Sequence, residues 1–227
     1  MKRLCHTYST LLCLSILWIS GCSPAENTQQ PFLTDSVKAP NGVIYCSEGN
    51  PSYFNPQLDT SSTTSDASTH QIYSRLLDFD EQTGRIQPAL ASSWLVSSDG
   101  LTYTFQLRRN VKFHTTDYFS PTRTFNAEDV LFSFNRWLDP QHPYHEVNGG
   151  NYPYFDSLNL AGKIKSIKRI NGYRIEISLY ERDSSFLANL ATDFAVILSA
   201  QYADALMLDK RQHEIDFYPI GTGPYQF

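Results

Sequence analysis

The clearest pattern of hydrophobic and polar positions lies in the middle of the chain. Asp99-Gly100 predicts a turn, and residues 102–107 alternate between apolar and polar side chains, as a half-buried strand does. Asn171-Gly172 separates residues 165–170 from the alternating residues 173–179, which is a strong hairpin signal. The pattern therefore predicts strands in all of these segments, within an α+β block.

One helix stands out in the same block. Asn126 can cap its N-terminus, and Glu128 and Asp129 lie in the first turn, where the positive end of the helix dipole favours carboxylates. Pro140 stops the helix because proline lacks a backbone donor. An apolar stripe at helical spacing follows the cap: Val130, Leu131, Phe134, Trp137 and Leu138. Because adjacent helical residues point in different directions, we interpret Glu128 and Asp129 as structural residues and not as a catalytic pair.

Other elements carry weaker signals. Residues 43–46 are typical of a short buried strand, and Thr64 or Ser65 can cap a helix over residues 66–77. Two further short helices are predicted, one after Ser184 and one after Ser199. We find no internal repeat or low-complexity tract that indicates a solenoid or a fibrous protein.

The N-terminus is typical of an exported protein. Lys2 and Arg3 precede an apolar run over residues 11–19, which has the length of a signal-peptide core and is too short to span a bilayer. The run ends in Ile19-Ser20-Gly21-Cys22, which resembles the bacterial lipobox, and that resemblance implies cleavage after residue 21 and lipidation of Cys22. An ordinary cleaved signal with an incidental cysteine is the alternative.

A polar segment separates this region from the rest of the chain. Residues 22–41 contain Ser, Pro, Thr, Gln and Asn with few apolar residues, which suits a flexible tether that holds a domain away from a membrane. Cys46 is then the one cysteine left without a role in an oxidising compartment. It can be buried and inert, pair with another chain, or pair with a cysteine beyond Phe227.

Charge and motifs argue against several classes of protein. The net charge is −5 and the Lys and Arg residues are scattered, which argues against a nucleic-acid partner and suits a cationic ligand better. Short signatures of serine hydrolases, zinc proteases and redox centres are absent, so we expect no enzyme, no metal and no cofactor. His142 and His145 have no neighbouring Cys or paired acids, and Gly221-Thr222-Gly223-Pro224 predicts a turn or hinge and not a phosphate loop.

Four segments form an ordered pattern: residues 87–94 (QPALASSW), 98–108 (SDGLTYTFQLR), 111–114 (VKFH) and 125–134 (FNAEDVLFSF). This pattern resembles the family 5 extracellular solute-binding proteins. The resemblance runs from residue 43 to the end of the chain, in the family's order and spacing. Within the family, residues 46–49 and 54–57 resemble the dipeptide-binding branch, while residues 116–123 and 151–158 resemble the branch of the Sap peptide-uptake system, which we favour.

This resemblance implies a fold and a division of the chain. The expected fold class is α+β (mixed α/β), the two-lobed fold of type II periplasmic binding proteins with an extra inserted domain, and the second lobe is expected to be absent here. Because the second lobe is missing, we expect the sequence to be a fragment or its reading frame to stop early. In the dipeptide-binding branch the disulfide partner of Cys46 also lies in the missing part, so Cys46 would pair with a cysteine outside the chain. The expected parts are a signal peptide (1–21), a lipidated tether (22–41), a first segment of lobe I (42–75), the inserted domain (76–216) and a return to lobe I (217–227).

The resemblance also implies a function. The chain is expected to be the non-catalytic binding protein of an ABC importer in the periplasm of a Gram-negative bacterium, with permease subunits as partners. Its ligands are expected to be peptides, cationic peptides among them, or haem. The family's ligand-contacting loop matches Ser61, Ser62 and Thr63, although dipeptide binders carry Gly at Ser62. The alternatives are that this loop only caps a helix, and that the chain is a structural lipoprotein which binds no solute.

Overall fold

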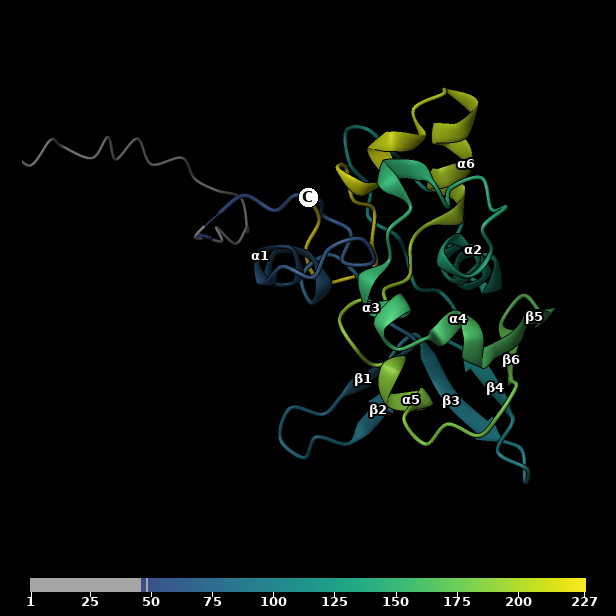
Figure 1. Cartoon of the computed structure of the whole chain (residues 1–227). Coiled ribbons are helices and arrows are strands. Elements are labelled where there is room, and N and C mark those ends of the chain that lie inside the picture. The colour runs from purple at the N-terminus through teal and green to yellow at the C-terminus, as the bar shows by residue number, and fades with distance from the viewer. Residues whose placement is uncertain (1–45, 48) are drawn as a thin grey trace, which may run out of the picture. The chain divides into compact units, whose positions relative to one another are not determined.

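A four-stranded antiparallel sheet in the order β3-β4-β6-β5 organises the fold (Figure 1). The computed structural model describes residues 46, 47 and 49–227, which lie within one compact unit that begins at Gly42. The strands of this sheet are β3 (Ala91–Val96), β4 (Thr102–Leu107), β5 (Ile164–Asn171) and β6 (Arg174–Leu179). A separate two-stranded sheet pairs β1 (Leu77–Phe79) with β2 (Ile86–Pro88).

The structure confirms the predicted strand pattern. Tyr103, Phe105 and Leu107 of β4 are buried, while the polar residues between them are half-exposed. Ile175 and Ile177 of β6 lie opposite Phe105 and Tyr103, so these four side chains enter the same core. The hairpin between β5 and β6 also forms where Asn171-Gly172 predicted it.

Helix α2 (Ala127–Leu138) covers one face of this sheet and is capped as predicted. The Asn126 side chain accepts a hydrogen bond from the Glu128 backbone N–H, and the Asp129 carboxylate accepts one from the Asn126 backbone N–H. Arg123 donates two hydrogen bonds to Asp129, and the Ala200 backbone N–H donates a third. Asp129 is therefore a buried structural residue that joins the start of α2 to the start of α6.

The remaining helices are short. Helix α6 begins after Ser199, whose hydroxyl accepts a hydrogen bond from the Tyr202 N–H, and confirms the prediction there. Helix α5 follows Ser184 as predicted but has only four residues. Directly after it, the Thr192 hydroxyl and backbone N–H both donate to the Asn189 carbonyl. The bounds are Pro153–Ser157 for α3, Leu160–Lys163 for α4, Phe186–Asn189 for α5 and Ala200–Leu208 for α6, with 3-10 turns η2 at Val147–Gly149 and η3 at Gln212–Asp216.

The predicted helix over residues 66–77 is wrong in its second half. The structure has a single turn of α1 (Ser62–Thr64) that continues as one π turn, η1 (Ser65–Thr69), and the cap is Ser61, not Thr64 or Ser65. The helix cannot continue because the carbonyls of Gln71 and Ile72 accept hydrogen bonds from the backbone N–H groups of Tyr225 and Gly223. The chain then enters β1 instead.

One hydrophobic core links the sheet, α2 and both ends of the described chain. Leu58 and Ile220 belong to the same buried cluster as Phe105, Val130 and Ile175. Its large aromatic members stack in the middle of the fold, with Trp137 and Phe155 4.2 Å apart at their ring centroids. The predicted boundaries at residues 75 and 216 remain predictions, since the first and last described segments pack into this shared core.

A buried ion pair connects three segments that are distant in sequence. Arg136 on α2 and Asp216 at the end of η3 are both 0% exposed, and the guanidinium donates two hydrogen bonds of 2.7 Å to the carboxylate. Asn55 and Asn148 donate further hydrogen bonds of 2.7 and 2.6 Å to the same carboxylate. Asp216 is thus fully satisfied by four donors from three different parts of the chain.

We predict that Asp216→Ala destabilises the protein by about 3–5 kcal/mol, because it leaves the Arg136 charge buried without a partner. Urea unfolding followed by circular dichroism measures this difference. The matched control is Glu214→Ala, which removes the partner of the half-exposed Arg211 and should cost less than about 1 kcal/mol. Equal decreases in the free energy of unfolding for the two variants would contradict the central role of Asp216.

Candidate functional site

The predicted ligand-contacting residues form the loop that begins α1. Asp59 organises this loop: its Oδ1 accepts from the Ser61 N–H at 2.9 Å, and its Oδ2 accepts from the Ser61 hydroxyl at 2.7 Å. The Thr64 hydroxyl also donates to Asp59 Oδ2 at 2.7 Å, and the Thr63 hydroxyl donates to Ser61 Oγ at 3.1 Å. Burial raises the pKa of the Asp59 carboxyl, but the hydrogen bonds from Thr64 and Ser61 outweigh it and hold this pKa below its usual value.

This network divides the predicted residues into two groups. The hydroxyls of Ser61 and Thr63 are already engaged within the loop, so their side chains shape it. Ser62 is exposed, and its side chain makes no hydrogen bond to the described residues. Ser62 is therefore the residue of the predicted site that is available to another molecule.

A cavity of about 400 Å³ lies beside the helix that follows this loop. Its lining comes from residues before α1, from η1 and the turn after it, and from the last residues of the chain: Ser47, Gly49, Asn50, Pro51, Phe54, Ala67, Gln71, Ile72, Tyr225, Gln226 and Phe227. Ser61, Ser62 and Thr63 do not line it. The predicted loop and this cavity therefore lie on the same segment of the chain, but the loop residues are not part of the cavity wall.

The predicted turn or hinge at residues 221–224 is a site of close backbone approach. A Cβ atom added to Gly221 would lie 1.9 Å from the Ile72 carbonyl oxygen, so only glycine fits there. His114 holds the same segment: its backbone N–H donates to the Gly221 carbonyl at 2.9 Å, and its Nε2 lies 2.8 Å from the Gly223 carbonyl. Burial lowers the pKa of His114 and outweighs the opposing effect of the hydrogen bond to Gly223, so the neutral imidazole is favoured.

The other predicted sites have simpler outcomes. Cys22 lies outside the described residues. Cys46 is exposed and forms no disulfide within the described part of the chain, so its partner remains a prediction. The His145 ring lies 2.8 Å from the Arg136 carbonyl, and residues 46–227 without residue 48 contain no cluster of His, Cys, Asp and Glu that could hold a metal. Nor does that part of the chain contain a helix long and apolar enough to cross a membrane.

Sequence reasoning missed a larger cavity, of about 670 Å³, between the β1–β2 hairpin, α3 and the segment after α5. Arg75 lies in it and donates to Asp193, a residue 118 positions away, at 2.9 Å. No local pattern could indicate this pairing, because both residues come from short irregular segments.

A family model matches the chain over residues 85–227, and its description is bacterial extracellular solute-binding proteins, family 5 Middle. The chain belongs to this family. The resemblance found in the sequence is thereby confirmed. The family consists of extracellular binding proteins and not of enzymes.

Curated relatives include members of both branches considered above. The chain is 49% identical to the dipeptide-binding protein of Escherichia coli over 184 residues, and 47% identical to the SapA protein of the same organism over 186 residues. These matches cover 81% and 82% of this chain. It is also 42% identical over 218 residues, or 95% of the chain, to heme-binding protein A of Haemophilus influenzae. These identities do not assign the chain to one branch.

Solved structures agree with the expected fold. A dipeptide-binding protein from Pseudoalteromonas sp. SM9913, solved in complex with Met-Leu, superposes with a TM-score of 0.78 at 48% identity over 80% of this chain. HbpA2 from Haemophilus parasuis gives a TM-score of 0.77 at 42% identity over 79% of this chain. The mixed fold of type II periplasmic binding proteins is therefore confirmed. The chain spans 34–40% of the length of the three curated relatives and 35–36% of these two structures.

We predict that Gly221→Ala destabilises the protein by about 2 kcal/mol or more, because the added methyl group collides with the Ile72 carbonyl. Gly172→Ala is the matched control, since an added Cβ there meets no atom within 4 Å. Thermal unfolding of both variants measures the difference. A Gly221→Ala protein as stable as Gly172→Ala would contradict the close approach.

We predict that acidification destabilises the folded protein through His114, because burial disfavours the charged form of its ring. Because its pKa is lower in the folded protein, the stability it contributes is present above its unfolded pKa of about 6.5 and is lost as the pH falls through its folded pKa. His114→Gln keeps a donor but does not titrate. Urea unfolding at about pH 7.5 and about pH 5.5 should show a smaller loss for His114→Gln than for the natural protein.

The control is His142→Gln, because burial also lowers the pKa of His142. This variant keeps His114, so the loss of stability on acidification that comes from His114 should remain. If His114→Gln loses as much stability on acidification as the natural protein, this role of His114 is wrong.

Proposed function

We propose that this chain supplies part of a peptide-binding protein that delivers its ligand to an ABC importer. The observation that carries the proposal is the similarity over 80% of the chain to a dipeptide-binding protein solved with Met-Leu bound. A second neighbour, DppA from Helicobacter pylori, was solved with the peptide STSA and is 40% identical with a TM-score of 0.75. Two similar proteins that were solved with a peptide bound therefore share this part of the fold.

The mode of binding follows from the requirements of a binder that accepts many peptides. Such a protein holds the peptide main chain and leaves the side chains in roomy, hydrated pockets. In this chain the loop of Ser61, Ser62 and Thr63 would contact the ligand, with Asp59 fixing its conformation and Ser62 presented outward. Ser62 adds a side chain where the dipeptide-binding branch is expected to carry glycine, so backbone contact to the peptide is restricted there.

The remaining proposals concern location and partners. The protein would be exported to the periplasm of a Gram-negative bacterium, anchored through lipid on Cys22, and would present its ligand to permease subunits in the inner membrane. Cys46 would pair with a cysteine beyond residue 227. Haem is a second ligand to test, because two similar proteins are named as heme-binding protein A and HbpA2. No catalytic step is proposed for any residue.

The test is a calorimetric titration of the protein purified from its own host with Met-Leu and, separately, with haem. Its intact mass, measured first, states whether Cys22 is lipidated and how long the chain under test is. Binding of Met-Leu would support the proposal. A folded protein that binds neither ligand would overturn it and favour the alternative of a lipoprotein that binds no solute.

We predict that Ser62→Trp lowers the affinity for Met-Leu by about tenfold or more, because the large side chain blocks the loop's outer surface. Its unfolding temperature should match that of the natural protein, since Ser62 is exposed and its side chain makes no hydrogen bond to the described residues. Ser62→Ala is the matched control and should bind as the natural protein does. Undiminished binding by Ser62→Trp would remove Ser62 from the ligand site.

A further inference from the structure

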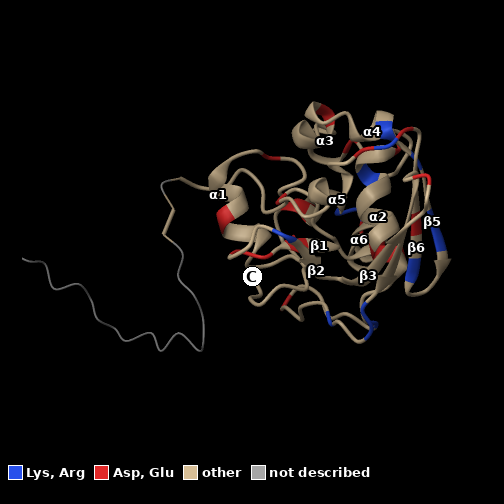
Figure 2. Ribbon diagram, turned by 90° about the horizontal axis from the view of Figure 1, so that it is seen from below, with Lys and Arg blue, Asp and Glu red and all other residues tan. Residues whose placement is uncertain are grey.

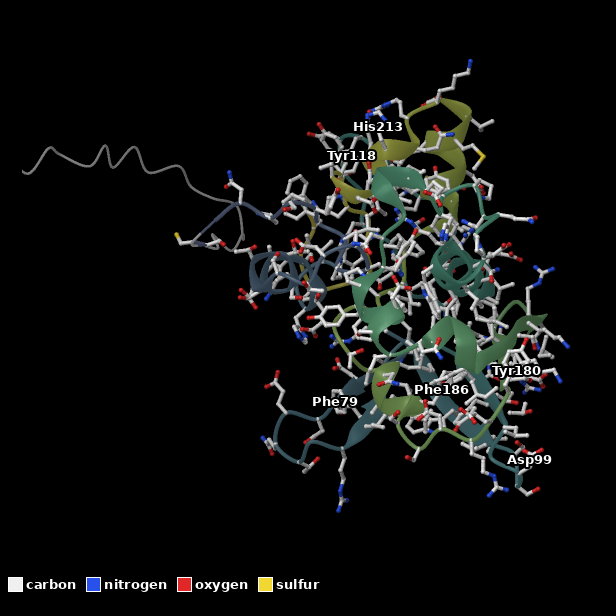
Figure 3. All side chains as sticks on the ribbon, viewed as in Figure 1. Phe79, Asp99, Tyr118, Tyr180, Phe186 and His213 are labelled. Atoms are coloured by element: carbon white, nitrogen blue, oxygen red, sulfur yellow. The ribbon has the colours of Figure 1, made fainter. Side chains whose placement is uncertain are left out.

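The cavity between the β1–β2 hairpin and α3 is not lined by the residues of the predicted loop. It has a volume of about 670 Å³, within the range of small-molecule sites. The β1–β2 hairpin supplies one wall through Asp78, Phe79 and Glu81, and Tyr154 of α3 supplies another. Residues 191–194 and the buried side chain of Arg75 complete it. Figure 3 labels Phe79 at this hairpin, which extends from the body of the fold.

Arg75 fixes two carboxylates at this cavity. Its side chain is 3% exposed, and its two terminal nitrogens donate to Asp193 Oδ1 at 2.9 Å and to Asp78 Oδ1 at 2.6 Å. The His70 ring bridges the same two groups: its Nε2 lies 3.2 Å from Asp193 Oδ1, and its Nδ1 lies 3.3 Å from a terminal nitrogen of Arg75. The two carboxylates are therefore held in place on the flanks of one guanidinium, which costs a ligand no reordering of these side chains.

The carboxylates retain acceptors that no described residue uses. Asp78 and Asp193 make these contacts through Oδ1 alone, and neither Oδ2 accepts a hydrogen bond from the described residues. Glu81 accepts none at either oxygen from that part of the chain. Three carboxylates and one guanidinium line the cavity, which leaves two negative charges when His70 is neutral. Figure 2 shows red acidic residues near β1, beside a blue one.

Three aromatic rings, of Phe79, Tyr154 and Phe194, also line the cavity. Tyr154 and Phe194 stack with their ring centroids 4.8 Å apart and their planes inclined by 17°, which gives the wall a rigid flat surface. Phe79 is 36% exposed although it is a large apolar residue. Aromatic faces beside carboxylates attract organic cations, because the ring quadrupole and the negative charges act in the same direction.

We propose that this cavity binds a guanidinium or a primary ammonium group, with Glu81 and the free Oδ2 atoms of Asp78 and Asp193 as acceptors and the aromatic wall as the packing surface. Its extension to basic peptides rests on the proposed function: the cavity would take an Arg or Lys side chain of the peptide. Arg75 is a positioning residue in this site, since it acts through the two aspartates.

The experiment compares two small probes of nearly the same shape, N-acetyl-arginine amide and N-acetyl-citrulline amide, by calorimetry at low salt. We expect the charged probe to bind at least about fivefold more tightly, because only the charged form pairs with carboxylates. Glu81→Gln should remove most of that preference without affecting folding, since Glu81 is exposed and unpaired among the described residues. Glu181→Gln, an exposed carboxylate outside the cavity, is the matched control and should retain it.

Two outcomes overturn the inference: equal binding of the two probes, or an arginine preference that survives Glu81→Gln. The test is separate from the test of the peptide-binding proposal. A protein that binds Met-Leu but does not distinguish the probes keeps the proposed function and loses this cavity as a cation site. A protein that prefers the arginine probe and binds no dipeptide keeps this cavity as a cation site and loses the proposed function.

Discussion

The buried ion pair between Arg136 and Asp216 is the interaction on which the arrangement of the chain depends. Removing two charges from water is costly, and the cost is offset only when the geometry is good and the remaining acceptors are filled. Here the contact is bidentate and two asparagines complete the carboxylate. Burial alone would lower the pKa of Arg136, but the Asp216 carboxylate outweighs it and raises this pKa, so the guanidinium stays charged. The pair therefore specifies where α2, η3 and the first described segment meet.

That placement determines the path of the residues on both sides of it. The Asp216 carbonyl accepts a hydrogen bond from the Phe54 N–H at 2.7 Å, which aligns the segment before the candidate loop with the start of the return segment. Five residues later, Gly221 passes against Ile72, and His114 binds the carbonyls of Gly221 and Gly223. The helix that follows Ser61 has to stop where this segment crosses it. The short helix is a consequence of that crossing.

The regular part of the fold could be predicted from the sequence because its signals are local. Alternation in residues 102–107, the Asn171-Gly172 turn and the Asn126 cap each report on neighbouring residues, and each was confirmed. The predicted helix over residues 66–77 failed because its apolar spacing is real but its carbonyls bind residues about 150 positions later. Local propensity cannot anticipate a competing partner that distant in the chain.

The candidate sites also contain some features that the sequence indicates locally and others that depend on distant residues. The loop of Ser61, Ser62 and Thr63 could be located from the sequence. The sequence could not reveal that the Ser61 hydroxyl donates to Asp59 while Ser62 is exposed. The larger cavity could not be predicted from the sequence, because it forms where Arg75 contacts Asp193, 118 positions away. Both sites use one arrangement: a carboxylate or guanidinium held by neighbouring side chains fixes the geometry, and a less constrained residue beside it, Ser62 or Glu81, remains available. A rigid support next to a free polar group is what a binding protein needs in order to hold a ligand without first paying to order its own side chains.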